Sequence, residues 1–142
     1  MMSFSPCGGY LAVGTHTSEI TIYSVHENYK INGMLKGHSS YINGIDWGID
    51  SMNLRSNDGA YELLFWDIEK MVQDKSGMTS MKGVQWDSHS CKISYNTIGM
   101  FPPSEDYTHI NSVAVSNSGN YLINGDDWGL VNIYNNPVPN DQ

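Results

Sequence analysis

The chain has 142 residues, a formal net charge of −8 at pH 7 and only seven lysines and arginines. This acidic balance argues against a nucleic-acid-binding protein, which needs clustered basic residues for phosphate contacts, and against binding to an anionic membrane surface. Aromatic residues make up 11% of the chain, far more than a disordered segment carries, so we expect a folded protein.

The first 36 residues predict part of a small antiparallel sheet. Two runs of strand length, Leu11–Gly14 and Glu19–Val25, are followed by a third around Tyr29–Leu35. Apolar and polar residues alternate in the second run, which is the pattern of a strand with one face buried. The segment before them, Ser3–Pro6, matches the end of an inner strand, so we expect the sequence to begin inside a repeating unit.

The stretch that follows opens with Gly37-His38 and reaches Trp66-Asp67, a bracket typical of one blade of a β-propeller. Between these pairs lie two aromatic-rich runs of strand length, Tyr41–Trp47 and Tyr61–Trp66. An Asp-Gly pair at residues 58–59 predicts a tight hairpin turn before the second run, since glycine accepts a positive φ. Residues 69–80 predict a loop that contains one strand.

The same pattern recurs at fixed offsets. Sliding the chain on itself by 43 residues lays residues 5–11 over residues 48–54, and sliding it by 111 lays them over residues 116–122. The first offset matches the period of WD repeats, roughly 40 to 45 residues, and the longer second interval therefore contains an insertion of about 25 residues.

The insertion predicts a short strand near Val84–Trp86, a polar turn, and a longer strand that ends at Pro102-Pro103. The final unit predicts inner strands between His109 and Tyr134, joined by a turn at Asp126–Gly129. We therefore expect an all-β chain of about three WD40-type β-propeller blades, each an antiparallel four-stranded sheet. The expected parts are a partial blade over 1–36, a blade over 37–82, a strand-containing insertion with an acidic loop over 83–108, and a partial blade with a C-terminal tail over 109–142.

Two long segments carry a more specific resemblance. They are GHSSYINGIDWGIDSMNLRSNDGAYELLFWD at residues 37–67 and VQWDSHSCKISYNTIGMFPP at residues 84–103. With them, the chain resembles the echinoderm microtubule-associated protein-like family of WD-repeat proteins. The resemblance implies a tandem pair of propellers that binds tubulin or microtubules, with this chain as part of the second, C-terminal propeller. It also implies a place on the cytoskeleton, in the cytoplasm or in a ciliary or flagellar axoneme.

The candidate site residues are those of a hydrogen-bonded chain across a blade. In WD repeats a His, a Ser or Thr, an Asp and a Trp can satisfy one another in this way. The candidates in the second blade are His38, Ser56, Asp58 and Trp66. The third blade offers His109 and Asp127, with Tyr134 in place of the Trp, and the first offers Tyr23 and Thr17. We expect these residues to have structural roles.

Other chemistry finds little support in the sequence. Cys7 and Cys91 have no metal-ligand or disulfide spacing, and no histidine pair has a third ligand nearby. We find no nucleophile motif and no phosphate-binding glycine loop, so we expect neither an enzyme nor a cofactor. Phe101, Tyr107 and Trp128 are loop aromatics and are candidates for protein contacts or for fillers between blades.

Three functional hypotheses stay open at this point. A non-catalytic surface for tubulin, microtubules or other microtubule-associated proteins comes first, a general WD adaptor in a non-cytoskeletal complex second, and an enzyme domain last. Closed propellers have four to eight blades, so we expect this sequence to be a fragment, completed by neighbouring blades of the same or another chain. Its open blade edges predict that it associates or folds poorly alone.

Overall fold

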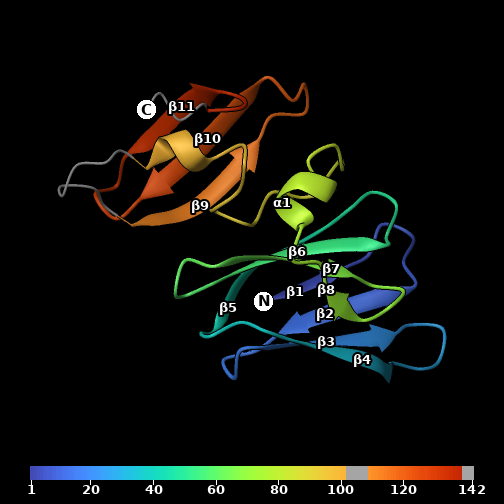
Figure 1. Cartoon of the computed structure of the whole chain (residues 1–142). Coiled ribbons are helices and arrows are strands. Elements are labelled where there is room, and N and C mark those ends of the chain that lie inside the picture. Colours follow the sequence, from blue (N-terminus) through green and yellow to red (C-terminus); the bar gives the residue numbers. More distant parts are fainter. Residues whose placement is uncertain (102–108, 139–142) are drawn as a thin grey trace. The chain divides into compact units, whose positions relative to one another are not determined.

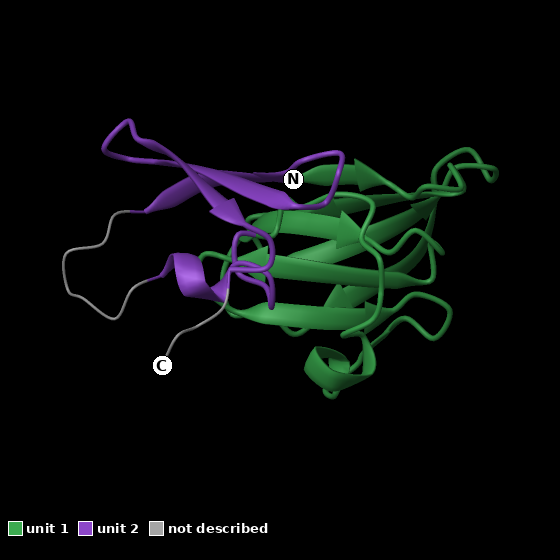
Figure 2. Cartoon of the chain, turned by 90° about the horizontal axis from the view of Figure 1, so that it is seen from above, with its two compact units in different colours: residues 1–91 green, residues 92–142 purple. Residues whose placement is uncertain are grey.

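The computed structural model describes residues 1–101 and 109–138. The chain forms two compact units, residues 1–91 and residues 92–142 (Figure 2). Each unit is built of antiparallel strands, which confirms the all-β, blade-type fold predicted from the sequence. Within the described residues, no helix is long and apolar enough to cross a membrane.

The first unit holds two four-stranded sheets with the strand orders β1-β2-β3-β4 and β5-β6-β7-β8 (Figure 1). Each sheet is a meander in which every strand pairs with the next one along the chain, as in a propeller blade. The strands are β1 Met2–Phe4, β2 Tyr10–Gly14, β3 Glu19–Ser24, β4 Lys30–Lys36, β5 Ile42–Trp47, β6 Asn53–Asp58, β7 Leu63–Asp67 and β8 Val72–Gln73.

One core joins these two sheets. Trp47 is fully buried, stacks on Tyr10 with ring centroids 6.3 Å apart, and donates its Nε1–H to the carbonyl of Ser3 at 3.1 Å. These contacts run from the second sheet to the first. The buried apolar side chains of the core are Ala12, Ile20, Ile22, Leu35, Ile42, Ile45, Trp47, Leu54, Trp66 and Ile68.

The second unit holds a three-stranded sheet with the order β11-β10-β9, formed by β9 Ile110–Val115, β10 Tyr121–Asp126 and β11 Val131–Asn135. A cluster of Met100, Ile110, Leu122 and Val138 is buried in this unit. One face of β11 is exposed and carries apolar side chains: Val131 is 71% exposed and Ile133 is 67% exposed.

The sequence repeat is visible in the turns that precede β2, β6 and β10. All three strands begin at the same position of the repeat, and each preceding turn is closed by the same pair of backbone hydrogen bonds, 2.8–2.9 Å long. Each turn also has one residue with positive φ at the same position: Gly8, Ser51 and Gly119. The repeat offsets of 43 and 111 residues therefore describe real structural copies.

The Asp-Gly turn forms for a different reason from the one its sequence suggests. Tyr61, not Gly59, takes the positive φ, at 65°. A Cβ on Gly59 would instead collide with the ring of Tyr41, so the glycine is needed for close packing. In the following loop, β8 is the expected single strand, while the short helix α1 at Gly77–Ser80 is not predicted by the sequence.

The insertion does not form the two strands that its sequence predicts. Trp86 makes one isolated bridge to Gly48, and the region of the longer predicted strand contains turns and a 3-10 helix, η1, at Ile98–Met100. Polar side chains explain the difference, because the backbone N–H of Ser94 donates to Thr97 Oγ1 at 2.8 Å. Such local hydrogen bonds compete with strand pairing. The predicted acidic loop lies outside the described residues.

Candidate functional site

The second blade brings its predicted polar residues together. The Trp66 Nε1–H donates to Ser56 Oγ at 2.8 Å, and Ser56 Oγ lies 2.6 Å from His38 Nε2. The other ring nitrogen, His38 Nδ1, lies 3.3 Å from Asp58 Oδ2, an ion-pair distance without hydrogen-bond alignment. All four residues are buried, and they connect the segment before β5 with β6 and β7.

Asp58 also organises the turn between β6 and β7. Its Oδ1 accepts hydrogen bonds from the backbone N–H groups of Ala60 at 3.0 Å and Glu62 at 2.9 Å, and its Oδ2 accepts one from Ser40 at 3.1 Å. Glu62 in turn accepts bonds from the backbone N–H and the hydroxyl of Ser39, each 2.9 Å long. The carboxylates therefore tie the turn to the loop before β5.

Burial determines the charge of His38. Desolvation lowers its pKa below the ordinary value, although Asp58 and Glu62 act in the opposite direction. Burial alone would raise the pKa of Asp58, but the hydrogen bonds from the turn outweigh it and the pKa is lowered. At neutral pH the network consists of a neutral imidazole beside a carboxylate.

His38, Asp58 and Glu62 are also the one described group of three side chains whose ligand atoms lie close enough to hold a metal ion, all within 4.8 Å of one another. The carboxylate oxygens of Asp58 and Glu62 already accept hydrogen bonds from backbone N–H groups, which accounts for the arrangement without a metal. The group fits a structural hydrogen-bond network better than a metal centre.

The third blade differs from its prediction. Asp126, not Asp127, takes the position of Asp58, because its Oδ1 accepts the backbone N–H groups two and four residues further on, at 3.0 and 2.9 Å. Asp127 is exposed and accepts a bond from the Asn111 side chain at 2.6 Å. His109 is exposed before β9, in the place that Tyr41 takes before β5. The residue equivalent to His38 lies outside the described residues.

The first blade lacks the chain of polar groups because different residues stand at the matching positions of its repeat. Thr15, rather than the predicted Thr17, stands at the position of Asp58, and its backbone N–H donates to the carbonyl of Glu19 at 3.1 Å. Val13 stands where the second blade has Ser56, so Tyr23 has no hydroxyl partner at that position of its sheet. The complete network belongs to the second blade alone among the described residues.

The sequence does not reveal a second polar group in the same blade. Asp46 on β5 and Arg55 on β6 are direct cross-strand partners, and Arg55 Nε donates to Asp46 Oδ2 at 3.0 Å. The exposed fractions of these residues are 0% and 3%. Burial would raise the pKa of Asp46, but Arg55 and the surrounding donors hold it below the ordinary value. The available signal is one acid between Ile45 and Trp47 and one arginine after Leu54, on facing strands.

Comparison with known proteins identifies the fold family. The family model of the echinoderm microtubule-associated protein second beta-propeller matches residues 1–142. The chain belongs to this family.

Relatives of this second propeller are similar over almost the whole chain. A ciliary WD repeat-containing protein, ctxp80, of Euplotoides octocarinatus is 44% identical over 96% of the chain. The 77 kDa echinoderm microtubule-associated protein of Lytechinus variegatus is 40% identical over 97%, and echinoderm microtubule-associated protein-like 2 of Rattus norvegicus is 39% identical over 96%. The chain spans about a fifth of the length of these relatives, between 19% and 21%.

The candidate contact residues of this second-propeller chain have different surroundings. Trp128 is 65% exposed in the turn between β10 and β11. Phe101 packs against the apolar cluster of the second unit, and Tyr107 lies outside the described residues. Trp128 is therefore the candidate whose ring is open to a partner.

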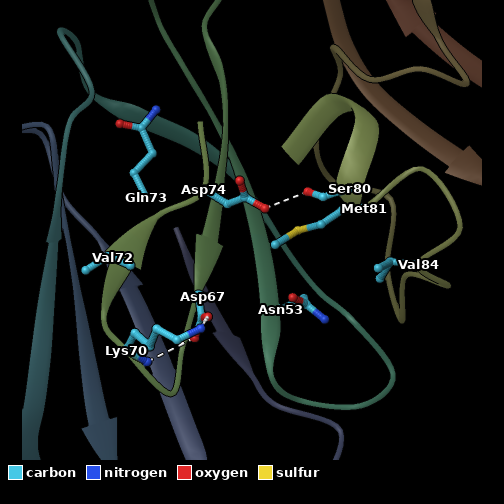
Figure 3. Close-up of a pocket in the computed structure, with 9 residues that line it drawn as sticks. All are labelled: Asn53, Asp67, Lys70, Val72, Gln73, Asp74, Ser80, Met81 and Val84. Atoms are coloured by element: carbon cyan, nitrogen blue, oxygen red, sulfur yellow. Dashed lines mark hydrogen bonds and ion pairs between the residues drawn. The ribbon is translucent and has the colours of Figure 1, made fainter. Parts of the chain in front are cut away.

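A shallow pocket of about 390 Å³ lies beside β7, β8 and α1 (Figure 3). It is lined by Asn53, Asp67, Lys70, Val72, Gln73, Asp74, Ser80, Met81 and Val84. Lys70 Nζ donates to Asp67 Oδ2 at 2.6 Å, and the Ser80 hydroxyl donates to Asp74 at 2.6 Å. The charged groups of the pocket are thus engaged by one another or by the hydroxyl of Ser80 on α1.

Proposed function

We propose that this chain supplies part of a rigid, non-catalytic propeller surface through which a microtubule-associated protein contacts tubulin, a microtubule or another microtubule-bound protein. The match to the second-propeller family over residues 1–142 carries the proposal. The relatives include proteins named as microtubule-associated and as ciliary, which supports a place on cytoplasmic or axonemal microtubules.

The second blade suits a scaffold. His38 Nε2, Ser56 Oγ and Trp66 Nε1 bond to one another within the blade, so this buried chain stabilises the sheet rather than facing a substrate. The charged residues of the pocket are likewise engaged by their neighbours. These contacts support a structural role for both groups.

Charge limits how such a surface meets a microtubule. The chain carries a net charge of −8, so simple attraction to the acidic tails of tubulin is unfavourable. Contact would use the folded body of tubulin or another microtubule protein. The exposed indole of Trp128 suits such a contact, because large aromatic side chains dominate many protein interfaces.

Co-sedimentation with polymerised tubulin tests the proposal. The chain is compared with a longer form extended at both ends to close the propeller, and we expect the longer form to pellet with microtubules. If neither form pellets, the likeness to the family concerns the fold, and the microtubule proposal fails.

The second candidate is a general WD adaptor for a non-cytoskeletal complex. The negative charge favours it, because an acidic surface selects partners with basic patches. Affinity capture with the longer form separates the two functions: recovered tubulin and microtubule proteins support the first, and a set of non-cytoskeletal partners supports the second.

A further inference from the structure

The segment Gln85–Cys91, here called the strap, lies along the free edge of β5. The backbone N–H of Ile49 donates to the Gln85 carbonyl at 2.9 Å, and the Asp87 N–H donates to the Trp47 carbonyl at 2.8 Å. Further along, the Ser90 hydroxyl replaces a strand partner. It accepts the N–H of Ile45 at 2.9 Å and donates to the carbonyl of the same residue at 2.8 Å. The strap therefore covers an edge of the sheet without forming a regular strand.

Asp46 holds the strap in place. Its Oδ1 accepts the Ser88 hydroxyl at 2.7 Å and the Ser90 N–H at 2.6 Å. Its Oδ2 accepts the Cys91 N–H at 3.0 Å and the Arg55 Nε–H at 3.0 Å. Both carboxylate oxygens are thus fully engaged, three times by the strap and once by Arg55.

The blade does not itself require this buried ion pair. The paired position is Ser3 with Ala12 in the first sheet and Ala114 with Ile123 in the third. Small or apolar residues therefore satisfy the same cross-strand position. The ion pair occurs, among the described residues, in the one blade that carries the strap, and a buried ion pair is by itself weak evidence for a stabilising role.

His89 completes the attachment and depends on its protonation state. Arg55 Nη2 lies 3.2 Å from His89 Nδ1. An arginine can only donate, so Nδ1 must accept and the imidazole must be neutral. The Arg55 guanidinium also lies over the Trp86 ring, with Cζ 4.6 Å from the ring centroid.

We propose that the strap is a releasable segment, closed on β5 when His89 is neutral and opened by protonation of His89 while the two sheets of the first unit stay folded. A protonated imidazole can no longer accept from Arg55 and places a second cation beside it. Asp46 on β5 is the neighbouring anion, but its lone pairs are occupied. Arg55 and Asp46 are the charged groups that act on the imidazole, and the strap itself also carries the titratable residues Asp87 and Cys91.

The direction of the pH dependence follows from the burial of the ring. Desolvation and the charge of Arg55 lower the pKa of His89, while Asp46 raises it less. The open strap restores the ordinary value of 6.5, so the open state binds more protons. Opening therefore increases as the pH falls below that value, by at most about tenfold per pH unit.

Hydrogen–deuterium exchange of the whole chain tests the proposal at about pH 7.5 and about pH 5.5, after correction for intrinsic exchange rates. We expect the strap amides to be protected at the higher pH and to lose several-fold of that protection at the lower pH, a larger loss than that of the amides of β3 and β6. Equal protection of the strap at both values, or a strap that is unprotected at both, would overturn the proposal.

His89→Gln provides the decisive variant, because its amide oxygen still accepts from Arg55 but does not titrate. We expect the strap of this variant to stay closed at both pH values. The matched control, His26→Gln, removes an exposed histidine and should retain the pH response. A pH response that persists in His89→Gln would refute the assignment to this residue. Ser88→Ala removes one bond to Asp46 and should loosen the strap at both values without altering β6.

Discussion

Replacing Ser56 with alanine should destabilise the second blade more than the loss of one small side chain implies. Its Oγ accepts from the Trp66 Nε1–H at 2.8 Å and lies 2.6 Å from His38 Nε2, and all three side chains are buried. The variant leaves two buried ring nitrogens without this partner. Each unsatisfied group costs about 1–3 kcal/mol, so for two groups we expect the free energy of unfolding to fall by roughly 2–6 kcal/mol.

Urea unfolding followed by tryptophan fluorescence measures this change, at a protein concentration where sedimentation shows a monomer. Thr17→Ala is the control in the same unit, since its hydroxyl is exposed, and it should change the stability by less than about 0.5 kcal/mol. If Ser56→Ala changes the stability as little as this control, then the serine does not support the two rings and the network argument is wrong.

Four further outcomes are expected. Gly44→Ala places a Cβ 2.9 Å from the strap backbone and should displace the strap at a cost of about 1–3 kcal/mol, seen as lost exchange protection there. Because burial lowers the pKa of His38, the unfolded chain binds more protons and stability should fall as the pH drops below 6.5; urea unfolding of His89→Gln against pH isolates this effect. Trp128→Ala should leave stability unchanged but reduce co-sedimentation of the longer form with microtubules, and equal pelleting would remove this residue from the interface. The exposed apolar side chains of β11 should make the chain associate with rising concentration in ultracentrifugation, whereas a monomer at every concentration would contradict this.

Sequence periodicity is sufficient to predict the repeating strands. The offsets depend on turn residues such as Gly8 and Gly119, whose positive φ the chain needs at the same point of each copy. The same regularity predicts which residues form the polar chain of the second blade, because His38 and Trp66 stand at the bracket positions of the repeat.

Single-residue placement is harder to predict. Asp126 and Asp127 are adjacent residues of the same type, so the residue type does not distinguish them. The turn hydrogen bonds show that Asp126 takes the place of Asp58. The strand prediction for the insertion is wrong for a related reason. Thr97 Oγ1 accepts the backbone N–H of Ser94 in a segment whose apolar residues suggest a strand.

The buried pair of Asp46 and Arg55 shows a different limit. Polar residues within a strand pattern normally predict a solvent-exposed face, and strand alternation gives no indication that a later segment covers that face. The strap compensates the burial of the Asp46 carboxylate, because it supplies three hydrogen bonds from a region more than 40 residues away in sequence. Only the tertiary structure shows this dependence.

The strap also occupies backbone groups of β5 that another chain could use. While it is attached, the N–H and carbonyl of Ile45 and the carbonyl of Trp47 are engaged in hydrogen bonds to the strap. An uncovered edge strand offers such groups to a strand of another molecule. Release of the strap would thus let protonation of one histidine favour self-association of the chain at low pH.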